Sequence, residues 1–139
     1  MLRRVSLLLI MCVMCVTAVS VSACTTSHDY SSELTCEQFA DNSQQSDSFA
    51  LEVGDKLRLE LCLDQAVGYQ WDYGFSTQNV VKVEDHDFRE PQQGSAAGVD
   101  LWTFEAVGKG TTEIQMEYCQ GAQGGAQAEW TYTITVTVE

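Results

Sequence analysis

Few side chains in this sequence have the type and spacing that catalysis requires. The 139 residues contain two histidines, and one of them, His86, lies in the acidic run Glu84-Asp85-His86-Asp87. This run could hold a cation, but it lacks the regular spacing of a calcium-binding loop. The chain has neither a Gly-x-Ser-x-Gly nucleophile elbow nor a phosphate-binding glycine loop followed by a helix. The sequence therefore predicts no enzyme, no metal site and no cofactor.

Cysteine is the other residue type that could do chemistry. Three of the six cysteines follow Cys24, namely Cys36, Cys62 and Cys119. We predict a Cys62–Cys119 disulfide, because each residue ends a strand-like segment and alternates with the apolar residues of that segment. On adjacent strands both sulfurs would then lie on one side, whereas strands facing each other across a core would fit poorly. Cys36 is left free, paired with Cys24 or joined to another chain.

The first 24 residues have the layout of an export signal. Arg3 and Arg4 precede an apolar run of about 15 residues, which is short for a membrane span of about 20. The run closes on Val21-Ser22-Ala23-Cys24, which resembles a bacterial lipobox. We expect a signal peptide over residues 1–23, lipidation of Cys24, and a membrane-anchored lipoprotein of the bacterial cell envelope or surface. An ordinary secretory signal, with Cys24 as a plain thiol, is the alternative.

The acidic balance excludes some partners. Seven Lys and Arg oppose twenty Asp and Glu, so the formal net charge is −13. Binding to nucleic acid depends on Lys and Arg that displace counterions, so no nucleic-acid partner is expected. An electrostatic grip on anionic lipid is disfavoured for the same reason. No small-molecule substrate is expected either.

The chain divides into a polar stretch and a strand-rich domain. Residues 24–48 are rich in Ser, Thr, Asp and Gln, and we predict a flexible surface tether, with one or two marginal helical turns within residues 32–40. Hydrophobic residues alternate with polar ones from Phe49 onward. About seven short strands over residues 49–139 predict an all-β fold, an antiparallel β-sandwich. Three segments escape the alternation, residues 64–68, 90–98 and 120–127, and loops of this kind often bind something.

Two parts of the domain resemble a known family. The segment Asp64-Gln65-Ala66-Val67-Gly68-Tyr69-Gln70-Trp71 is similar to the Asn-Pro-Thr-Thr-Gly-Tyr-x-Trp segment of the chagasin-type inhibitors of papain-like cysteine proteases. Residues 98–110 resemble the second loop and following strands of that family, and Ile114 through Tyr118 resembles its next strand. The resemblance covers residues 49–139 and implies an immunoglobulin-like β-sandwich.

The resemblance also implies a binding site made of three loops inserted into a protease cleft. Its expected residues are Asp64, Gln65, Ala66, Val67, Gly68 and Tyr69 in a central wedge, Ser95, Ala96, Ala97 and Gly98 on one flank, and Gln120 and Gly121 on the other. The family carries Arg-Pro-Trp soon after the position of Tyr118, where this chain has Cys119-Gln120-Gly121-Ala122. We expect Trp130 to begin the last strand instead of filling that role.

Two functions follow from the resemblance and its departures. The first is a lipid-anchored, exported and reversible inhibitor of papain-like cysteine endopeptidases. The alternative is an envelope module of the same fold that no longer inhibits and binds another protein. The missing Arg-Pro-Trp favours the alternative, because a rigid aromatic anchor often dominates the energy of an interface.

Overall fold

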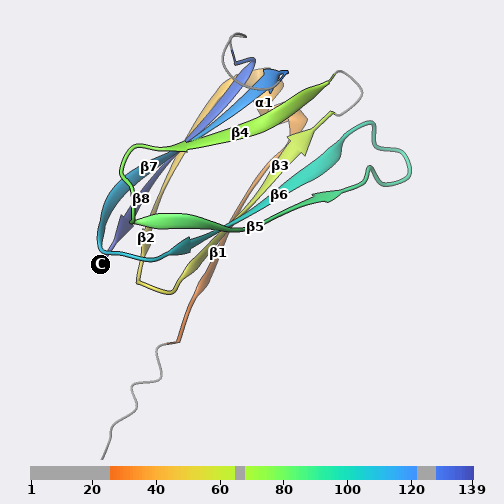
Figure 1. The fold of residues 1–139 in the computed structure, drawn as a ribbon. Helices are drawn as coiled ribbons and strands as arrows, with labels where there is room; N and C mark the ends of the chain where they lie inside the picture. Colours follow the sequence, from red (N-terminus) through yellow and green to blue (C-terminus); the bar gives the residue numbers. More distant parts are fainter. Residues whose placement is uncertain (1–25, 65–67, 122–127) are drawn as a thin grey trace, which may run out of the picture.

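Two four-stranded sheets pack face to face in the computed structural model, which describes residues 26–64, 68–121 and 128–139 (Figure 1). The first sheet contains, in spatial order, β1 (Asp29–Leu34), β3 (Lys56–Leu63), β6 (Gly98–Ala106) and β5 (Val81–Arg89). The second contains β2 (Gln44–Leu51), β8 (Trp130–Val138), β7 (Gly110–Gln120) and β4 (Tyr69–Phe75). One short helix, α1 (Cys36–Asp41), joins β1 to β2. The prediction of an all-β sandwich is confirmed, with eight strands in the described residues.

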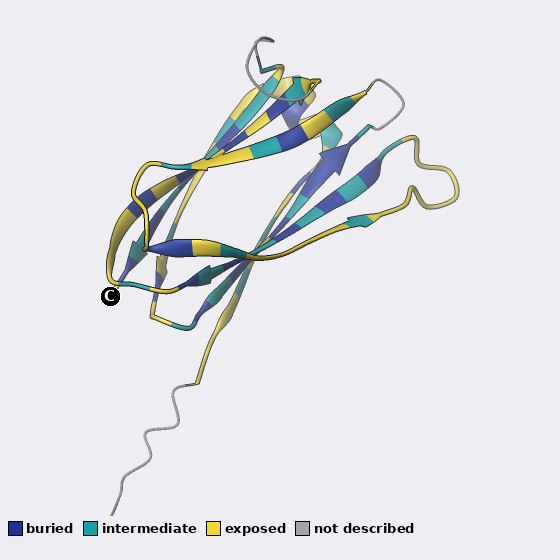
Figure 2. Ribbon diagram, viewed as in Figure 1, coloured by how far each residue is buried: buried dark blue, intermediate teal, exposed yellow. Residues whose placement is uncertain are grey.

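Buried residues alternate with more exposed ones along the strands (Figure 2), and the buried apolar residues form one core cluster between the sheets. The even-numbered residues of β6 and the odd-numbered leucines of β3 point inward and are buried, and β7 and β8 follow the same rule. The largest fully buried side chains are Tyr118, Tyr132, Phe39 and Phe104. A strand with one face on a core and one toward water produces this period of two.

The polar stretch before Phe49 is part of the sandwich, so the prediction of a tether over residues 24–48 is wrong from Asp29 onward. β1 pairs with β3 and β2 pairs with β8, both in parallel, at one edge of each sheet. The other strand pairs are antiparallel. Main-chain hydrogen bonds to a neighbouring strand order these residues although they bury few side chains. Edge strands tolerate polar residues, and this is why the composition resembled a linker.

The disulfide joins Cys36 of α1 to Cys62 of β3, with 5.2 Å between their Cα atoms. The predicted Cys62–Cys119 bond is therefore wrong, and Cys119 is a free, half-buried thiol. β3 and β7 belong to different sheets, and both cysteines alternate with inward-facing residues. Their side chains therefore point to opposite outer faces of the sandwich. The predicted disulfide required both side chains on the same face of adjacent strands.

Two further searches cover only the described part of the chain. Across residues 26–64, 68–121 and 128–139, no helix is long and apolar enough to cross a membrane. Over the same ranges, no group of three or more His, Cys, Asp or Glu side chains lies close enough together to hold a metal ion. The predicted signal peptide and Cys24 fall in residues 1–25, outside the described residues.

Candidate functional site

The strand ends that flank three loop segments lie at one end of the sandwich (Figure 1). We call residues 64–68 the central loop, 90–97 the second loop and 120–129 the third loop. Leu63 at the end of β3 pairs with Gly98 at the start of β6, so the central and second loops leave the first sheet side by side. Tyr69 at the start of β4 pairs with Gln120 at the end of β7, which brings the third loop to the same end.

The predicted site residues that the structure describes lie at this end. They are Asp64, Gly68, Tyr69, Ser95, Ala96, Ala97, Gly98, Gln120 and Gly121. Three others, Gln65, Ala66 and Val67, lie outside the described residues, as does the tip of the third loop, residues 122–127.

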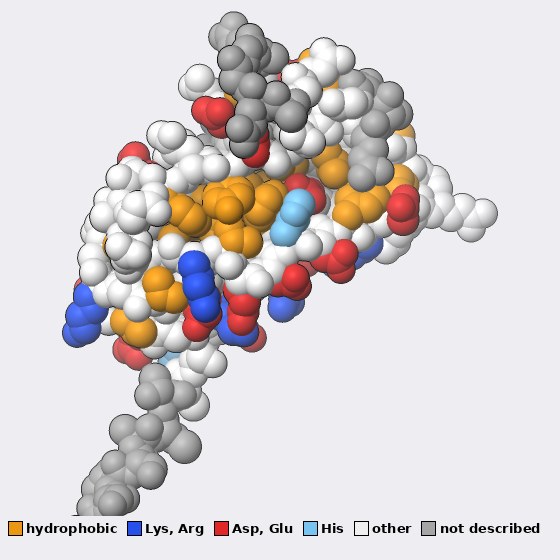
Figure 3. All heavy atoms as spheres, in the orientation of Figure 1, with side chains coloured by type: hydrophobic (Ala, Val, Ile, Leu, Met, Phe, Trp, Pro, Cys, Tyr) orange, Lys and Arg blue, Asp and Glu red, His pale blue; other side chains and the backbone are white. Residues whose placement is uncertain are grey.

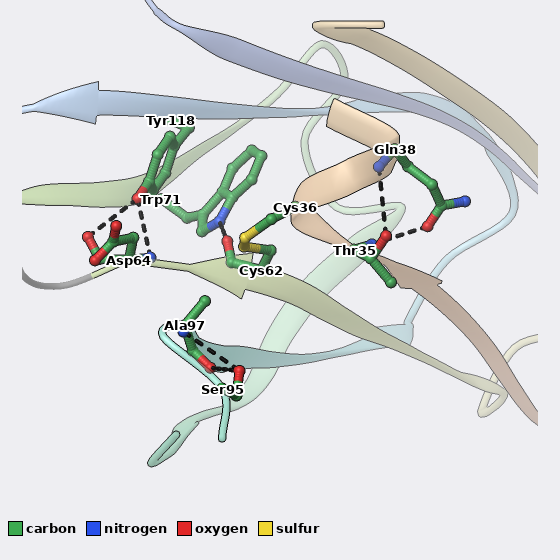
Figure 4. The surroundings of a disulfide bond; sticks show 9 residues. All are labelled: Thr35, Cys36, Gln38, Cys62, Asp64, Trp71, Ser95, Ala97 and Tyr118. Carbon is green, nitrogen blue, oxygen red and sulfur yellow. Dashed lines mark hydrogen bonds between the residues drawn. A yellow bond between two sulfur atoms is a disulfide. The ribbon is translucent and has the colours of Figure 1, made fainter. Parts of the chain in front are cut away.

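The base of the central loop is held by two aromatic side chains (Figure 4). The Tyr118 hydroxyl accepts a hydrogen bond from the backbone N–H of Asp64 (3.1 Å) and donates one to its carbonyl (3.3 Å). Burial is the main cause that raises the pKa of Tyr118, so this hydroxyl stays protonated and able to donate. The indole N–H of Trp71 donates to the carbonyl of Cys62 at 2.9 Å. The chain is thus fixed immediately before the loop.

Gly68 ends the central loop in a conformation that other residues resist. Its φ is +74°, and a Cβ placed on it would meet nothing within 4 Å. The constraint is therefore in the backbone and not in lack of space. The next residue, Tyr69, stacks on Tyr118 at 5.1 Å between ring centroids. A hydrogen bond to the Glu129 carboxylate is the main cause that raises the pKa of the Tyr69 hydroxyl, and it links the central loop to the third.

An aromatic cluster lies beneath the loops. Tyr118 stacks on Trp130 with ring centroids 4.6 Å apart, and Trp71 lies 5.1 Å from Tyr118. Phe39 of α1 stacks on Trp130 at 5.1 Å and packs against Trp71 at 5.2 Å. Trp130 begins β8 as the sequence predicted. Because these rings come from four elements, they form a rigid platform from which the central and third loops leave.

The second loop is shaped by its own hydrogen bonds and by a close approach of two strands. Ser95 Oγ donates to the carbonyl of Ala97 at 2.9 Å. A Cβ on Gly98 would lie 2.4 Å from the ring of Phe88 and 2.7 Å from the carbonyl oxygen of Arg89. Only glycine allows β5 and β6 to approach this closely where the loop rejoins the sheet. The close contacts with Phe88 and Arg89 are therefore sufficient to explain why residue 98 is glycine.

The base of the third loop is closed by a hydrogen bond from the Glu129 N–H to the Tyr118 carbonyl, at 2.9 Å. Gly121 has a φ of +83°, which turns the chain out of β7. The same Tyr118 therefore supports the central loop through its hydroxyl and the third loop through its backbone.

The sequence predicts only one or two marginal helical turns within residues 32–40, and the structure forms the capped helix α1 there, which also lies at this end. The Thr35 hydroxyl accepts from the Gln38 N–H, and the Gln38 side chain accepts from the Thr35 N–H, so the helix begins with a complete capping box. Thr-x-x-Gln before the buried Phe39 is the signal that could have revealed it. A hollow of about 350 Å³ separates α1 from the second loop, and both Cys36 and Cys62 line it together with Ser95, Ala97 and Gly98.

His86, the residue that drew attention to the acidic run, is not at this end. It lies on β5, where its Nε2 is 2.7 Å from the buried carboxylate of Asp100 and its ring stacks on Trp102 at 3.6 Å. Asp100 also accepts from the Trp102 indole at 2.8 Å. Figure 3 shows hydrophobic side chains gathered on this side of the sandwich, with a histidine at their margin. Half-exposed Tyr73 of β4 packs against Trp102 here. His86, Trp102 and Tyr73 therefore lie on the side of the sandwich where the edge strands β4 and β5 are found.

The arrangement suits docking and offers nothing for a reaction. The loop residues that the structure describes contribute backbone groups, small side chains and no base–nucleophile pair. Strand pairing, a disulfide and an aromatic platform fix them before any partner arrives. Such a surface can fill a cleft at small cost in conformational entropy.

Known structures share this fold. The cysteine protease inhibitor EhICP2 from Entamoeba histolytica superposes with a TM-score of 0.63 at 14% sequence identity, covering 82% of this chain and 100% of that one. PbICP-C, solved in complex with falcipain-2, superposes with a TM-score of 0.53 at 19% identity, covering 79% of this chain and 99% of that one. None of the curated proteins is a significant sequence match.

The family assignment comes from the sequence itself. The family model described as chagasin family peptidase inhibitor I42 matches residues 50–136, which is more than half of the chain. The match spans the central loop, the second loop and the third loop, and it ends within β8. The chain belongs to the chagasin family of peptidase inhibitors.

Proposed function

We propose that this protein is a reversible inhibitor of papain-like cysteine endopeptidases. The observation that carries the proposal is that the strand ends beside three loop segments lie together at one end of a chagasin-family sandwich. Two similar structures support the partner class, since EhICP2 is a cysteine protease inhibitor and PbICP-C forms a complex with falcipain-2. Membership of an inhibitor family also agrees with the prediction that the chain is not an enzyme.

In this proposal the central loop enters the active-site cleft and the other two loops contact its rims. Tyr118 holds the backbone of Asp64 from both sides, and Gly68 redirects the chain into β4. A loop fixed in this way occupies the cleft without relaxing into the geometry that cleavage requires. Inhibition is therefore reversible, because no covalent bond to the protease forms.

We also propose that the protein is exported and anchored through a lipid on Cys24. The support is the sequence pattern of residues 1–24, with its basic start, apolar run and small residues before a cysteine. Mass spectrometry of the membrane-extracted protein tests this directly. A diacylglyceryl modification on Cys24 is expected, and an unmodified N-terminus beginning elsewhere would contradict it.

The inhibitory function is tested by titrating papain with the purified protein and following residual activity. We expect saturable, reversible inhibition. Gly68→Ala should weaken it by about tenfold or more, because a side chain disfavours φ of +74° and the loop must change its path. Gly74→Ala is the matched control, since Gly74 lies on β4, has no positive φ and has room for a Cβ.

A folded sample that leaves papain fully active at micromolar concentrations would contradict the proposal. The alternative of a non-inhibitory module that binds another envelope protein would then stand. The residues Cys119-Gln120-Gly121, at the place where the family carries Arg-Pro-Trp, favour that alternative. Equal inhibition by the wild type and Gly68→Ala would instead show that the central loop is not part of the binding site.

A further inference from the structure

We infer that the Cys36–Cys62 disulfide positions the protease-binding loops, and that a dithiol reductant which opens it weakens inhibition. The inference rests on the proposed inhibitory function. It concerns a bond from Cys62, inside the segment matched by the family, to Cys36 on a helix that lies before that segment. Its basis is the set of contacts that α1 makes at the loop end of the sandwich.

The helix contacts residues next to two of the loops and faces the third across the hollow. The disulfide joins it to Cys62, two residues before Asp64 at the start of the central loop. Phe39 stacks on Trp130, which directly follows the third loop. Across the hollow, α1 faces the second loop at Ser95 and Ala97. Thus α1 links the bases of the central and third loops.

The covalent bond ties this short helix directly to β3. α1 has six residues, and helices of this length are unstable without tertiary contacts. Phe39 is its one buried side chain. When the bond is broken, the stacking of Phe39, the capping box and the pairing of Leu34 with Leu61 remain, but Cys62 is no longer tied to α1. The loops then lose part of the preorganisation on which tight binding depends.

Solvent can reach the bond. Both cysteines line the hollow of about 350 Å³ that opens beside α1, and Cys36 is half-buried. A small dithiol that enters can attack the bond and form a mixed disulfide. Its second thiol then closes the reagent into a cyclic disulfide, so that Cys36 and Cys62 each gain one electron and one proton. Cys119 cannot substitute as a partner, because it leaves the opposite face of the sandwich.

The two partners would then respond to reductant in opposite senses. A papain-like protease needs its nucleophilic cysteine in the reduced form. The inhibitor needs its disulfide intact to hold its loops. Reducing conditions would therefore activate the protease and release it at the same time.

The test compares inhibition constants for papain that has been activated and then freed of reductant by gel filtration. We expect wild-type protein treated with dithiothreitol to bind papain about tenfold more weakly than untreated protein, with faster dissociation and with recovery on reoxidation. The double variant Cys36→Ser, Cys62→Ser should bind weakly with or without reductant. Cys119→Ser is the matched control and should respond to reductant as the wild type does.

Three results separate the possible failures. Thiol titration first shows that the bond has opened, and circular dichroism shows that the sandwich remains folded. Inhibition constants that agree within about twofold between oxidised and reduced protein would overturn the positioning role while leaving the inhibitory function intact. Untreated wild type that does not inhibit papain would overturn the proposed function and this inference with it. If the double variant does not fold, the inhibition constant of the reduced wild type alone tests the positioning role.

Discussion

The Tyr118 hydroxyl holds the start of the central loop through the main-chain N–H and carbonyl of Asp64. Tyr118→Phe removes the two hydrogen bonds to Asp64 and keeps the stacking on Trp130. We expect the unfolding free energy to fall by about 1 kcal/mol, and the inhibition constant to rise about tenfold because the loop base is released. Urea unfolding and papain titration measure the two effects.

Tyr132→Phe is the control for that variant. Tyr132 is also fully buried, and its hydroxyl bonds to Ser32 and Asp47 of β1 and β2 and to no loop. It should lose comparable stability and keep the wild-type inhibition constant. If the two variants inhibit equally well, the Tyr118 hydroxyl does not hold the loop in its binding shape.

At the scale of elements, α1 contributes one side chain to the core, and that side chain carries much of its packing. Phe39→Ala removes a ring that contacts Trp71 and Trp130. We expect a loss of about 3 kcal/mol in stability and a change in the near-ultraviolet circular dichroism of the tryptophans. Asp41→Ala, an exposed change on the same helix, should leave both unchanged. A Phe39→Ala protein with wild-type stability would show that the helix is peripheral.

The sequence predicted the elements whose side chains alternate and missed those that main-chain bonds hold. β3, β4 and β6–β8 follow the expected pattern because one face of each lies on the core. β1 and β2 show little alternation, since they lie at sheet edges. The sequence correctly predicts that Cys62 and Cys119 alternate with the inward-facing residues of their strands. That alternation does not indicate which sheet a strand joins, and β3 and β7 belong to different sheets. The motifs predicted which residues lie at the loop end, whereas no sequence pattern indicates the two hydrogen bonds between Tyr118 and the backbone of Asp64.

At the scale of the whole molecule, we expect stability at low pH to depend on Asp55, in the turn at the end of the sandwich opposite the loops. The buried carboxylate of Asp55 accepts from the N–H groups of Glu52 and His28, and these bonds lower its pKa below the ordinary value of 3.8. Its contribution to stability is therefore complete above that value and is lost as the pH falls through the lowered pKa. Thermal unfolding should show a steeper loss of stability in this range for the wild type than for Asp55→Asn. Asp41→Asn, on an exposed carboxylate, should keep the wild-type slope, and an identical slope for Asp55→Asn would exclude Asp55 as its source.

β1 begins beside Lys56, at the end of the sandwich remote from the loops, and runs toward them in parallel with β3. The eight residues of β3 span about 26 Å at 3.3 Å per residue. Four residues separate Cys24 from Asp29. If Cys24 carries the lipid that we propose, the folded sandwich would itself be the spacer, because β1 starts at the end of the sandwich that lies opposite the loops. The strand ends beside the loops would then be separated from the anchored end by the length of β3.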